Sequence, residues 1–322
     1  MALILPSNVT TISLLAEKLA QGQLVAFPTE TVYGLGADAT NSTAVAAIYA
    51  AKGRPSFNPL IAHYPSLQAA QTDAVFSDQA LKLAQAFWPG PLTLVVPKRP
   101  ESKVCGLATA GLDTIAVRVP AHPVALELLT QCKTPIVAPS ANPSGFLSPV
   151  TAQQVEKGLG TKINWILDGG KTHKGLESTI VDCTTSTPTI LRHGPLIAQT
   201  LANVIDTLKE SSSHTDTSPK APGMLLQHYA PRCPLRLSIN APQDGEALLA
   251  FGPGLTPIGF EIILNLSPTG NLQEAAANLF DYLHKLEDLH VSGIAVMPIP
   301  KDGLGEAIHD KLTRAAHGSG AL

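Results

Sequence analysis

Apolar runs alternate with helix-period patterns along residues 1–205. Runs rich in β-branched residues, such as LTLVVP (Leu92–Pro97), predict strands, whereas apolar residues recurring every three or four positions, as in DQALKLAQAF (Asp78–Phe87), predict helices. Because helices interleave with strands and some strands are consecutive, the pattern predicts an α/β fold built on a mixed sheet.

The same pattern gives approximate positions for the elements of this part. The predicted helices are Thr11–Ala20, Ser42–Ala51, Asp78–Phe87, Pro123–Cys132, Ala152–Gly158 and Ile197–Lys209. The predicted strands are Gln23–Phe27, Leu60–Tyr64, Leu92–Pro97, Thr114–Val119, Pro135–Ala138, Trp165–Leu167, Ser178–Asp182 and Thr189–Arg192.

A polar segment, ESSSHTDTSPKAP (Glu210–Pro222), has the composition of a linker. It is followed by GMLLQHYAPRCP (Gly223–Pro234), which is too patterned to be a simple spacer. Beyond it a second, Rossmann-like α/β unit is expected. Its predicted strands are Leu235–Ile239, Ala247–Phe251, Ile262–Leu266 and Gly293–Met297, and its predicted helices are Leu272–Leu289 and Gly305–Ala316.

The composition is that of a soluble globular enzyme. Hydrophobic residues make up 44% of the 322 residues and charged residues 15%. No apolar stretch reaches the roughly 20 residues of a membrane-spanning helix, and the first ten residues do not resemble a signal peptide. Four widely spaced cysteines with no CxxC pair fit reduced thiols in the cytoplasm.

Charge is divided unevenly along the chain. Residues 1–205 carry 14 Lys and Arg against 12 Asp and Glu, whereas residues 206–322 carry 8 against 13, which gives the net charge of −3. This is not the basic stripe of a dedicated nucleic-acid-binding protein. Any RNA contact is therefore expected to be local or to be made by partner proteins.

Two segments near the N-terminus suggest a polyphosphate site. FPTETVYGLGADAT (Phe27–Thr40) passes from a strand into small and hydroxyl residues, and KGRPSFNPL (Lys52–Leu60) places Lys52 and Arg54 two residues apart after a helix. Arg offers a planar fork to phosphate oxygens and Lys a mobile point charge. The alternative is a helix C-terminus that carries cations to complement its dipole. Neither segment is a P-loop or a dinucleotide fingerprint.

Further candidates lie along the predicted strands. His63 lies at the end of the strand in LIAHY (Leu60–Tyr64), where it is either a structural histidine or a ligand at a strand end. In DTIAVRVP, alternation puts Thr114 and Arg118 on one face, where Arg118 either pairs at the sheet edge or captures a carboxylate.

Three later segments add hydroxyl, amide and cationic groups. APSANPSG (Ala138–Gly145), with Ser148 just beyond, is either an ordinary turn or a cradle for phosphate in which Ser140 and Asn142 are best placed. Ser178 begins one predicted strand and Arg192 ends another, and either could be structural.

Other catalytic patterns are missing. The chain has no GxSxG elbow, no HExxH motif and no evident pair of carboxylates. The candidates bind phosphate and carboxylate, with no obvious nucleophile or general base. We therefore expect catalysis by positioning and charge neutralisation, as in nucleotidyl transfer.

Taken together, these segments resemble the YrdC-like threonylcarbamoyl-AMP synthases. The resemblance spans, in family order, FPTETVYGLGADA, KGRPSFNPL, FWPGPLTLV, TIAVRVPAHP, APSANPSG, LDGG, GLESTIVD and LRHGP, and covers nearly all of residues 8–205. APGMLLQHYAP (Ala221–Pro231) and the second α/β unit resemble the long two-domain form. The resemblance implies a twisted mixed sheet with flanking helices in a catalytic domain at 1–208, a linker that acts as a lid at 209–232, and a smaller Rossmann-like domain at 233–322.

The resemblance also implies a reaction. L-threonine, bicarbonate or CO2, and ATP would give threonylcarbamoyl-adenylate and pyrophosphate, with Mg2+ accompanying the triphosphate. A partner transferase would pass the threonylcarbamoyl group to the adenosine beside the anticodon of tRNA, and transient contact with tRNA is left open. No membrane partner is implied.

Site residues follow from the matched motifs. Those implied for threonine are Thr31, His63, Arg118, Ser178 and the backbone around Ala138. Those implied for ATP are Lys52, Arg54, Asn58, Thr114, Ser140, Asn142, Ser148, Arg192 and Tyr229, with Lys52 and Arg54 acting on the phosphates and Tyr229 reaching over the nucleotide from the linker.

Two alternatives stay open. Related modules make plain carbamoyl-adenylate from carbamoyl phosphate, although in larger proteins with extra domains that are not evident here. A second alternative is a binding module, for example an RNA-binding or ribosome-associated factor that has lost catalysis. Dependence on threonine would distinguish a threonylcarbamoyl-AMP synthase from the first alternative. Formation of an adenylate would distinguish it from the second.

Overall fold

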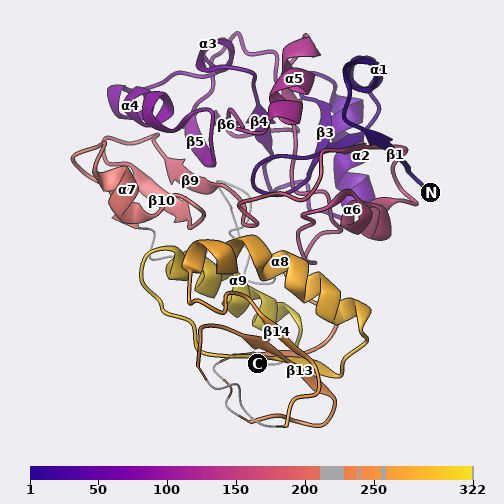
Figure 1. Cartoon of the computed structure of the whole chain (residues 1–322). Coiled ribbons are helices and arrows are strands. Elements are labelled where there is room, and N and C mark those ends of the chain that lie inside the picture. The colour runs from indigo at the N-terminus through magenta and orange to yellow at the C-terminus, as the bar shows by residue number, and fades with distance from the viewer. Residues whose placement is uncertain (211–227, 238, 240, 255–258, 321–322) are drawn as a thin grey trace.

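The chain folds into two α/β units that meet along a helical face (Figure 1). The structure, a computed structural model, describes residues 1–210, 228–237, 239, 241–254 and 259–320. The N-terminal unit contains the larger sheet, and the C-terminal unit presents helices α8 (Leu272–Asp288) and α9 (Leu304–Gly318) to it (Figure 1).

One sheet of eleven strands runs through the described part of the N-terminal unit. Its spatial order is β1-β8-β2-β3-β7-β4-β6-β5-β9-β10-β11. The strands are β1 (Leu3–Pro6), β2 (Val25–Phe27), β3 (Gly34–Asp38), β4 (Ile61–His63), β5 (Leu92–Pro97), β6 (Thr114–Arg118), β7 (Ile136–Val137), β8 (Trp165–Asp168), β9 (Thr179–Asp182), β10 (Thr189–Arg192) and β11 (Lys209–Glu210).

The sheet is mixed and is covered on both faces. It contains parallel pairs such as β4 with β6 and antiparallel pairs such as β5 with β6. The residues Leu92–Val96 of β5 are all buried, as expected for an apolar strand between two layers. The helices of this unit are α1 (Val9–Ala20), α2 (Ser42–Lys52), α3 (Leu67–Ala70), α4 (Asp78–Phe87), α5 (Pro123–Gln131), α6 (Ala152–Leu159) and α7 (Ala198–Ala202).

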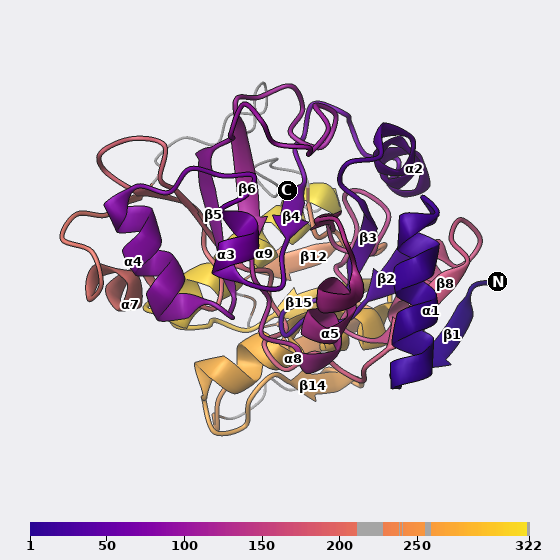
Figure 2. The same ribbon diagram turned by 90° about the horizontal axis from the view of Figure 1, so that it is seen from above.

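Helices α3, α4 and α5 lie on the side of the sheet away from the C-terminal unit (Figure 1). Seen from above, α1 and α5 pack side by side (Figure 2). The opposite side of the sheet faces the C-terminal unit.

The C-terminal unit is built on a four-stranded parallel sheet in the order β12-β15-β13-β14. Its strands are β12 (Leu235–Leu237), β13 (Glu246–Ala250), β14 (Ile263–Asn265) and β15 (Gly293–Val296). Asn271 caps α8 by accepting from the backbone N–H groups of Gln273 and Glu274. A parallel sheet with helices across it is the Rossmann-like arrangement that the sequence predicts.

The two units share one apolar cluster. Val32, Leu147, Val150 and Leu176 of the N-terminal unit pack with the buried faces of α8 and α9. Lys171 reinforces this contact through an ion pair to Asp281 of α8 at 2.7 Å. The interface therefore holds the C-terminal unit over the loops that follow β2 and precede β9.

The α/β class is confirmed, and most elements begin and end within two residues of their predicted positions. β3 has no counterpart among the predicted strands, because GLGAD lacks β-branched and aromatic residues. It is a strand because β2 and β7 pair with it on both sides. A Cβ on Gly36 would lie 2.8 Å from a ring carbon of Phe27, so this strand must contain glycine to pack here.

The helix predicted over Ile197–Lys209 is wrong beyond its first turns. Helix α7 ends at Ala202, and Lys209 joins β11, where its N–H donates to the carbonyl of Pro188 at 2.9 Å. Strand pairing with β10 therefore overrides the local helical pattern.

The borders expected at 1–208, 209–232 and 233–322 stay predictions. Most of the lid expected at 209–232 lies outside the described residues, except for its first two residues and the stretch from His228 to Arg232. Among the described residues, no helix is long and apolar enough to cross a membrane.

The two units approach each other closely at Gly175. This glycine has a left-handed φ of 69°, and a Cβ there would lie 2.4 Å from the carbonyl oxygen of Ala276 in α8. Gly170 has a similar φ of 80° but nothing within 4 Å of such a Cβ. We expect Gly170→Ala to cost about 1 kcal/mol from backbone strain alone, and Gly175→Ala to cost about 2 kcal/mol more from overpacking.

Chemical denaturation of the two variants measures this difference. Equal free energies of unfolding for Gly170→Ala and Gly175→Ala would contradict the close approach of α8.

Candidate active site

The order of the strands brings distant polar residues to one place. β4 ends at His63 and β6 ends at Arg118, and these two residues are register neighbours in the parallel pair. Because β5 is antiparallel to β6 and parallel to β9, the start of β9 lies at the same edge as the ends of β4 and β6. The strand-end position predicted for His63 is confirmed, and Arg118, predicted within its strand, is the last residue of β6.

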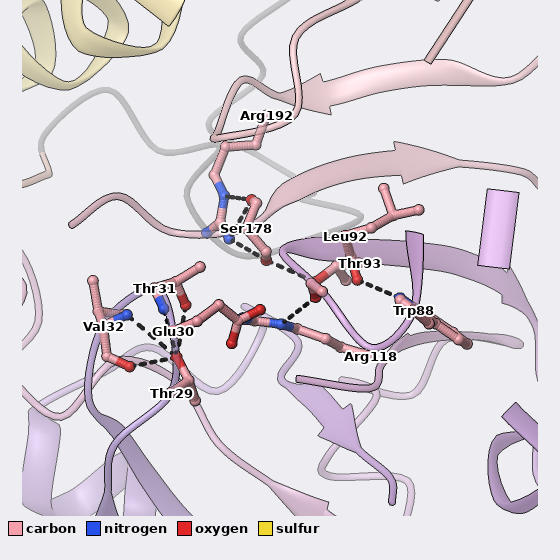
Figure 3. Close-up of polar contacts among 11 residues, drawn as sticks. Thr29, Glu30, Thr31, Val32, Trp88, Leu92, Thr93, Arg118, Ser178 and Arg192 are labelled. Atoms are coloured by element: carbon pink, nitrogen blue, oxygen red, sulfur yellow. Dashed lines mark hydrogen bonds and ion pairs between the residues drawn. The ribbon is translucent and has the colours of Figure 1, made fainter. Parts of the chain in front are cut away.

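Ser178 and Arg192 join this group from β9 and β10. Ser178 directly precedes β9, and its Oγ lies 2.7 Å from Oγ1 of Thr93 on β5 (Figure 3). Arg192 ends β10, which is antiparallel to β9, and its guanidinium donates to the carbonyl of Ser178 at 2.9 Å and to its Oγ at 3.1 Å. The serine is thus held from both sides by the sheet.

These groups surround one cavity at this edge of the sheet. Nine of the residues predicted for the site line it, from eight separate segments of the chain. They are Thr31, Arg54, His63, Arg118, Ala138, Ser140, Ser178, Arg192 and Tyr229. Val32, Ile61, Pro139, Glu177 and His228 complete the lining.

Lys52 lies behind this lining and fixes the loop after β7. It is buried at the end of α2, and its Nζ donates to the carbonyl of Ser140 at 2.6 Å and to the carbonyl of Asn142. Burial lowers the pKa of Lys52 well below its usual value and the charge of Arg54 lowers it further, whereas the carboxylate of Glu177 raises it. An anionic ligand would restore the pKa of this amine.

Arg54 is held by the backbone of its own segment. Gly53 ends α2 in the left-handed conformation, so the chain turns and the guanidinium of Arg54 reaches the carbonyls of Asn58 at 3.3 Å and Pro59 at 3.1 Å. Burial lowers the pKa of Arg54 to about 10, and the charge of Arg192 also lowers it. Several buried cations therefore face one another across the cavity, which favours a multiply charged anion there.

Arg118 forms a buried ion pair with Glu30. One Nη of Arg118 lies 2.8 Å from Oε1 of Glu30, and both side chains are less than 5% exposed (Figure 3). Neither of these two atoms has a hydrogen-bond partner among the described residues, so the contact is an ion pair without a directed hydrogen bond. The pair fixes the position of Arg118 from the side of the β2–β3 loop, where Thr29 also bonds Thr31 at 2.7 Å.

His63 is neutral at ordinary pH. Burial and the nearby charge of Arg118 lower its pKa to about 3, although backbone hydrogen bonds partly oppose this. Nδ1 lies 3.1 Å from the carbonyl of Ile61 and so carries the ring proton. Nε2 is then left as an acceptor, which suits a hydroxyl or amine donor of a ligand.

Tyr229 covers the cavity from the side of the C-terminal unit. It is fully buried in the left-handed conformation, with φ of 64°, and its ring packs 5.5 Å from that of Phe280 in α8. The next residue, Ala230, donates its N–H to the carbonyl of Gly145 at 2.8 Å. The described end of the expected lid is therefore docked between α8 and the APSANPSG loop.

Besides Lys52, four predicted residues do not line the cavity. Asn58, Asn142 and Ser148 lie just behind the lining, where Asn142 bonds the carbonyls of its own loop and Ser148 donates to Glu177. Thr114 begins β6 opposite Pro97, about 13 Å along the strand from Arg118 at the usual rise per residue. The ATP roles assigned to these residues stay predictions.

Two buried carboxylates were missed by the sequence reasoning, which found no evident pair. Glu30 lies between Thr29 and Thr31, and Glu177 directly precedes Ser178. The available signal was their position beside the very hydroxyl residues chosen as ligands. Neither is part of a metal cluster, since the described residues hold no group of three His, Cys, Asp or Glu that could bind a metal ion.

The arrangement suits two anions held side by side. Arg118, His63 and Ser178 come from neighbouring strand ends, whereas Arg54 and Ser140 line the same cavity with Lys52 behind Ser140. A planar guanidinium suits a carboxylate, and several cations with backbone groups suit phosphates.

Comparisons with known proteins match both units. Residues 17–194 match the Sua5, YciO and YrdC family model, described as "Telomere recombination". Residues 196–317 match the model described as "Threonylcarbamoyl-AMP synthase, C-terminal domain". This chain belongs to the Sua5/YrdC family. It has the long two-domain form of that family, because both models match in order.

Relatives of full length support the same assignment. The threonylcarbamoyl-AMP synthase of Bacillus subtilis is 37% identical over 98% of this chain and 95% of its own length. The synthase of Pyrococcus abyssi is 40% identical over 92% of each chain. The crystal structure of P. abyssi Sua5 complexed with L-threonine matches with a TM-score of 0.90 and 36% identity, over 99% of this chain and 98% of that one. The two-unit Sua5 fold is therefore that of this chain.

His63 should make stability depend on pH. Its folded pKa of about 3 lies below the ordinary value of 6.5, so its contribution is complete above pH 6.5 and is lost as pH falls toward 3. Between pH 7 and pH 5 this loss amounts to about 2 kcal/mol. Urea denaturation at the two pH values should therefore show a drop in wild type that is about 2 kcal/mol larger than in His63→Gln.

The exposed His317 provides the matched control. The free energy of unfolding of His317→Gln should fall between pH 7 and pH 5 by as much as that of wild type. An equal drop in wild type and His63→Gln would mean that His63 is not buried in its neutral form.

Proposed function

We propose that this chain is an L-threonylcarbamoyladenylate synthase, a nucleotidyltransferase that acts on L-threonine, bicarbonate or CO2, and ATP. The observation that carries this proposal is the single cavity in which Arg118, His63 and Ser178 lie beside Arg54, Arg192 and Ser140. Two similarities support the proposal. The full-length relatives are named threonylcarbamoyl-AMP synthase, and P. abyssi Sua5 has a crystal structure in complex with L-threonine.

Threonine is held at the end of the cavity formed by β4, β6 and β9. Arg118 takes its carboxylate, and Glu30 keeps the guanidinium oriented from behind. Neutral His63 accepts a hydrogen bond from the threonine amine or hydroxyl, and Thr31, Ser178 and the backbone at Ala138 complete the contacts.

ATP is held by Lys52, Arg54, Ser140 and Arg192, with Asn58, Thr114, Asn142, Ser148 and Tyr229 as further contacts. The threonine nitrogen attacks the carbon of CO2, loses a proton and becomes a carbamate. A carbamate oxygen then attacks the α-phosphorus, and the bond to the β-phosphate breaks. Lys52 and Arg54 stabilise the charge that develops on the leaving pyrophosphate. Mg2+ bound with ATP would neutralise part of the same charge.

Tyr229 and the C-terminal unit cover the cavity and so keep water away from the threonylcarbamoyl-adenylate product. An acyl-adenylate hydrolyses readily, and a closed cavity also strengthens each electrostatic contact. The product would serve a partner transferase that modifies tRNA beside the anticodon, in the cytoplasm, with at most local contact between this chain and tRNA.

The direct test incubates the purified chain with ATP, Mg2+, L-threonine and labelled bicarbonate. The expected result is label in an adenylate, together with pyrophosphate, only when threonine is present. Label from carbamoyl phosphate without threonine would favour a plain carbamoyl-adenylate synthase. ATP binding without turnover would favour a binding module.

Lys52 and Arg54 should be needed for the chemical step. Replacing both with Ala removes two buried cations from the phosphates, and we expect kcat/KM to fall by about 10³-fold or more. Lys82→Ala, an exposed lysine of α4, is the control and should stay at the wild-type rate. Retained threonine binding would show that the double variant is folded. Full activity in that folded double variant would overturn the triphosphate assignment.

A further inference from the structure

Glu177 has no role in the steps above, yet it lines the same cavity. Among the described residues of the lining, it is the one carboxylate, beside Arg54, Arg118 and Arg192. Its side chain is 5% exposed. A carboxylate placed where a triphosphate is to bind repels that ligand unless a cation lies between them.

One carboxylate oxygen of Glu177 accepts a hydrogen bond, and the other has no hydrogen-bond partner among the described residues. Oε1 accepts the hydroxyl of Ser148. Oε2 is buried and has no hydrogen-bond partner among the described residues, and no described cation lies at ion-pair distance from Glu177. A buried anionic oxygen left without a partner is costly, so a cationic ligand is expected there.

The surroundings of Glu177 place it beside the nucleotide rather than beside threonine. Its charge raises the pKa of Lys52, the lysine that holds the Ser140 loop. Its hydrogen-bonded partner, Ser148, is also a residue of the proposed ATP site. Arg118, which takes the threonine carboxylate, already has its own acid in Glu30.

A second unpartnered group lines the same cavity. The hydroxyl of Tyr229 is buried without a partner in the described structure. Burial raises the pKa of Tyr229, and the charge of Glu177 raises it further. Both Glu177 and the hydroxyl of Tyr229 therefore face this cavity with a polar atom that no described residue satisfies.

We propose that Glu177 supplies a direct protein ligand to the divalent cation that accompanies the triphosphate. This inference rests on the proposed function, since it assumes that ATP binds in this cavity. It fits the coordination habit of Mg2+, which keeps several waters and takes one or two carboxylates together with substrate phosphates.

The test compares nucleotide binding with and without metal in wild type and Glu177→Gln. The probe is α,β-methylene-ATP, titrated calorimetrically in Mg2+ and in EDTA. Wild type should bind the magnesium form of the nucleotide about tenfold more tightly than the metal-free form. Glu177 attracts the magnesium ion, whereas it repels the metal-free triphosphate. Glu177→Gln should bind the metal-free form more tightly than wild type does, and its preference for metal should nearly vanish.

A second readout follows the metal itself. Electron paramagnetic resonance of Mn2+ with α,β-methylene-ATP should give about tenfold weaker retention of the ion in the Glu177→Gln complex than in wild type. Glu177→Asp keeps the charge and should keep the metal preference. Glu30→Gln, a buried acid of the same site that faces Arg118, is the matched control and should lower threonine affinity without changing the metal preference.

Each other outcome overturns the inference in a distinct way. An unchanged metal preference in Glu177→Gln would exclude Glu177 as a ligand. The same result together with weaker threonine binding would assign Glu177 to the threonine ammonium instead. If wild type bound neither form of the nucleotide, the proposed function would fail along with the inference, whereas binding of both forms with equal affinity would remove the inference alone.

Discussion

The burial of several cations around one cavity is the constraint on which the rest of the structure depends. Lys52, Arg54, Arg118 and Arg192 are each at most 8% exposed, and each loses hydration on folding. Backbone carbonyls and Glu30 offset this cost in part. Loops that supply these carbonyls must therefore be fixed, and the charge that is still unbalanced is a driving force for binding an anion.

The C-terminal unit makes this burial possible. Without α8, α9 and Tyr229 over it, the cavity would open to water, and screening would weaken every contact inside it. Buried Lys311 of α9 extends the polar contacts across the interface, because its Nζ donates to the carbonyl of His193, the residue after Arg192, at 3.0 Å. The second unit thus supports the site through Tyr229, which packs against Phe280 of α8, whereas the described lining of the cavity contains no residue of α8 or α9.

The sequence predicted the parts of the site that have a local signature. His63, Arg118 and Arg192 end strands whose apolar patterns are clear, so their positions could be inferred. Glu30 and Glu177 had only a weak signal, their position next to Thr31 and Ser178, because their importance comes from strands that are paired far apart in the chain.

The fold shows the same division. Strong periodic elements such as α4 were predicted to the residue, whereas β3 depends on neighbours on both sides and the region after α7 on pairing with β10. Tertiary contacts decide such weak segments.

The most direct test of the central claim, that this buried cationic cavity adenylates a carbamate of threonine, is ATP–pyrophosphate exchange. Labelled pyrophosphate should enter ATP only when L-threonine and bicarbonate are both present, because only then can the adenylate form and reverse. Exchange that proceeds without threonine would contradict the account. So would the absence of exchange in folded protein that binds ATP and threonine.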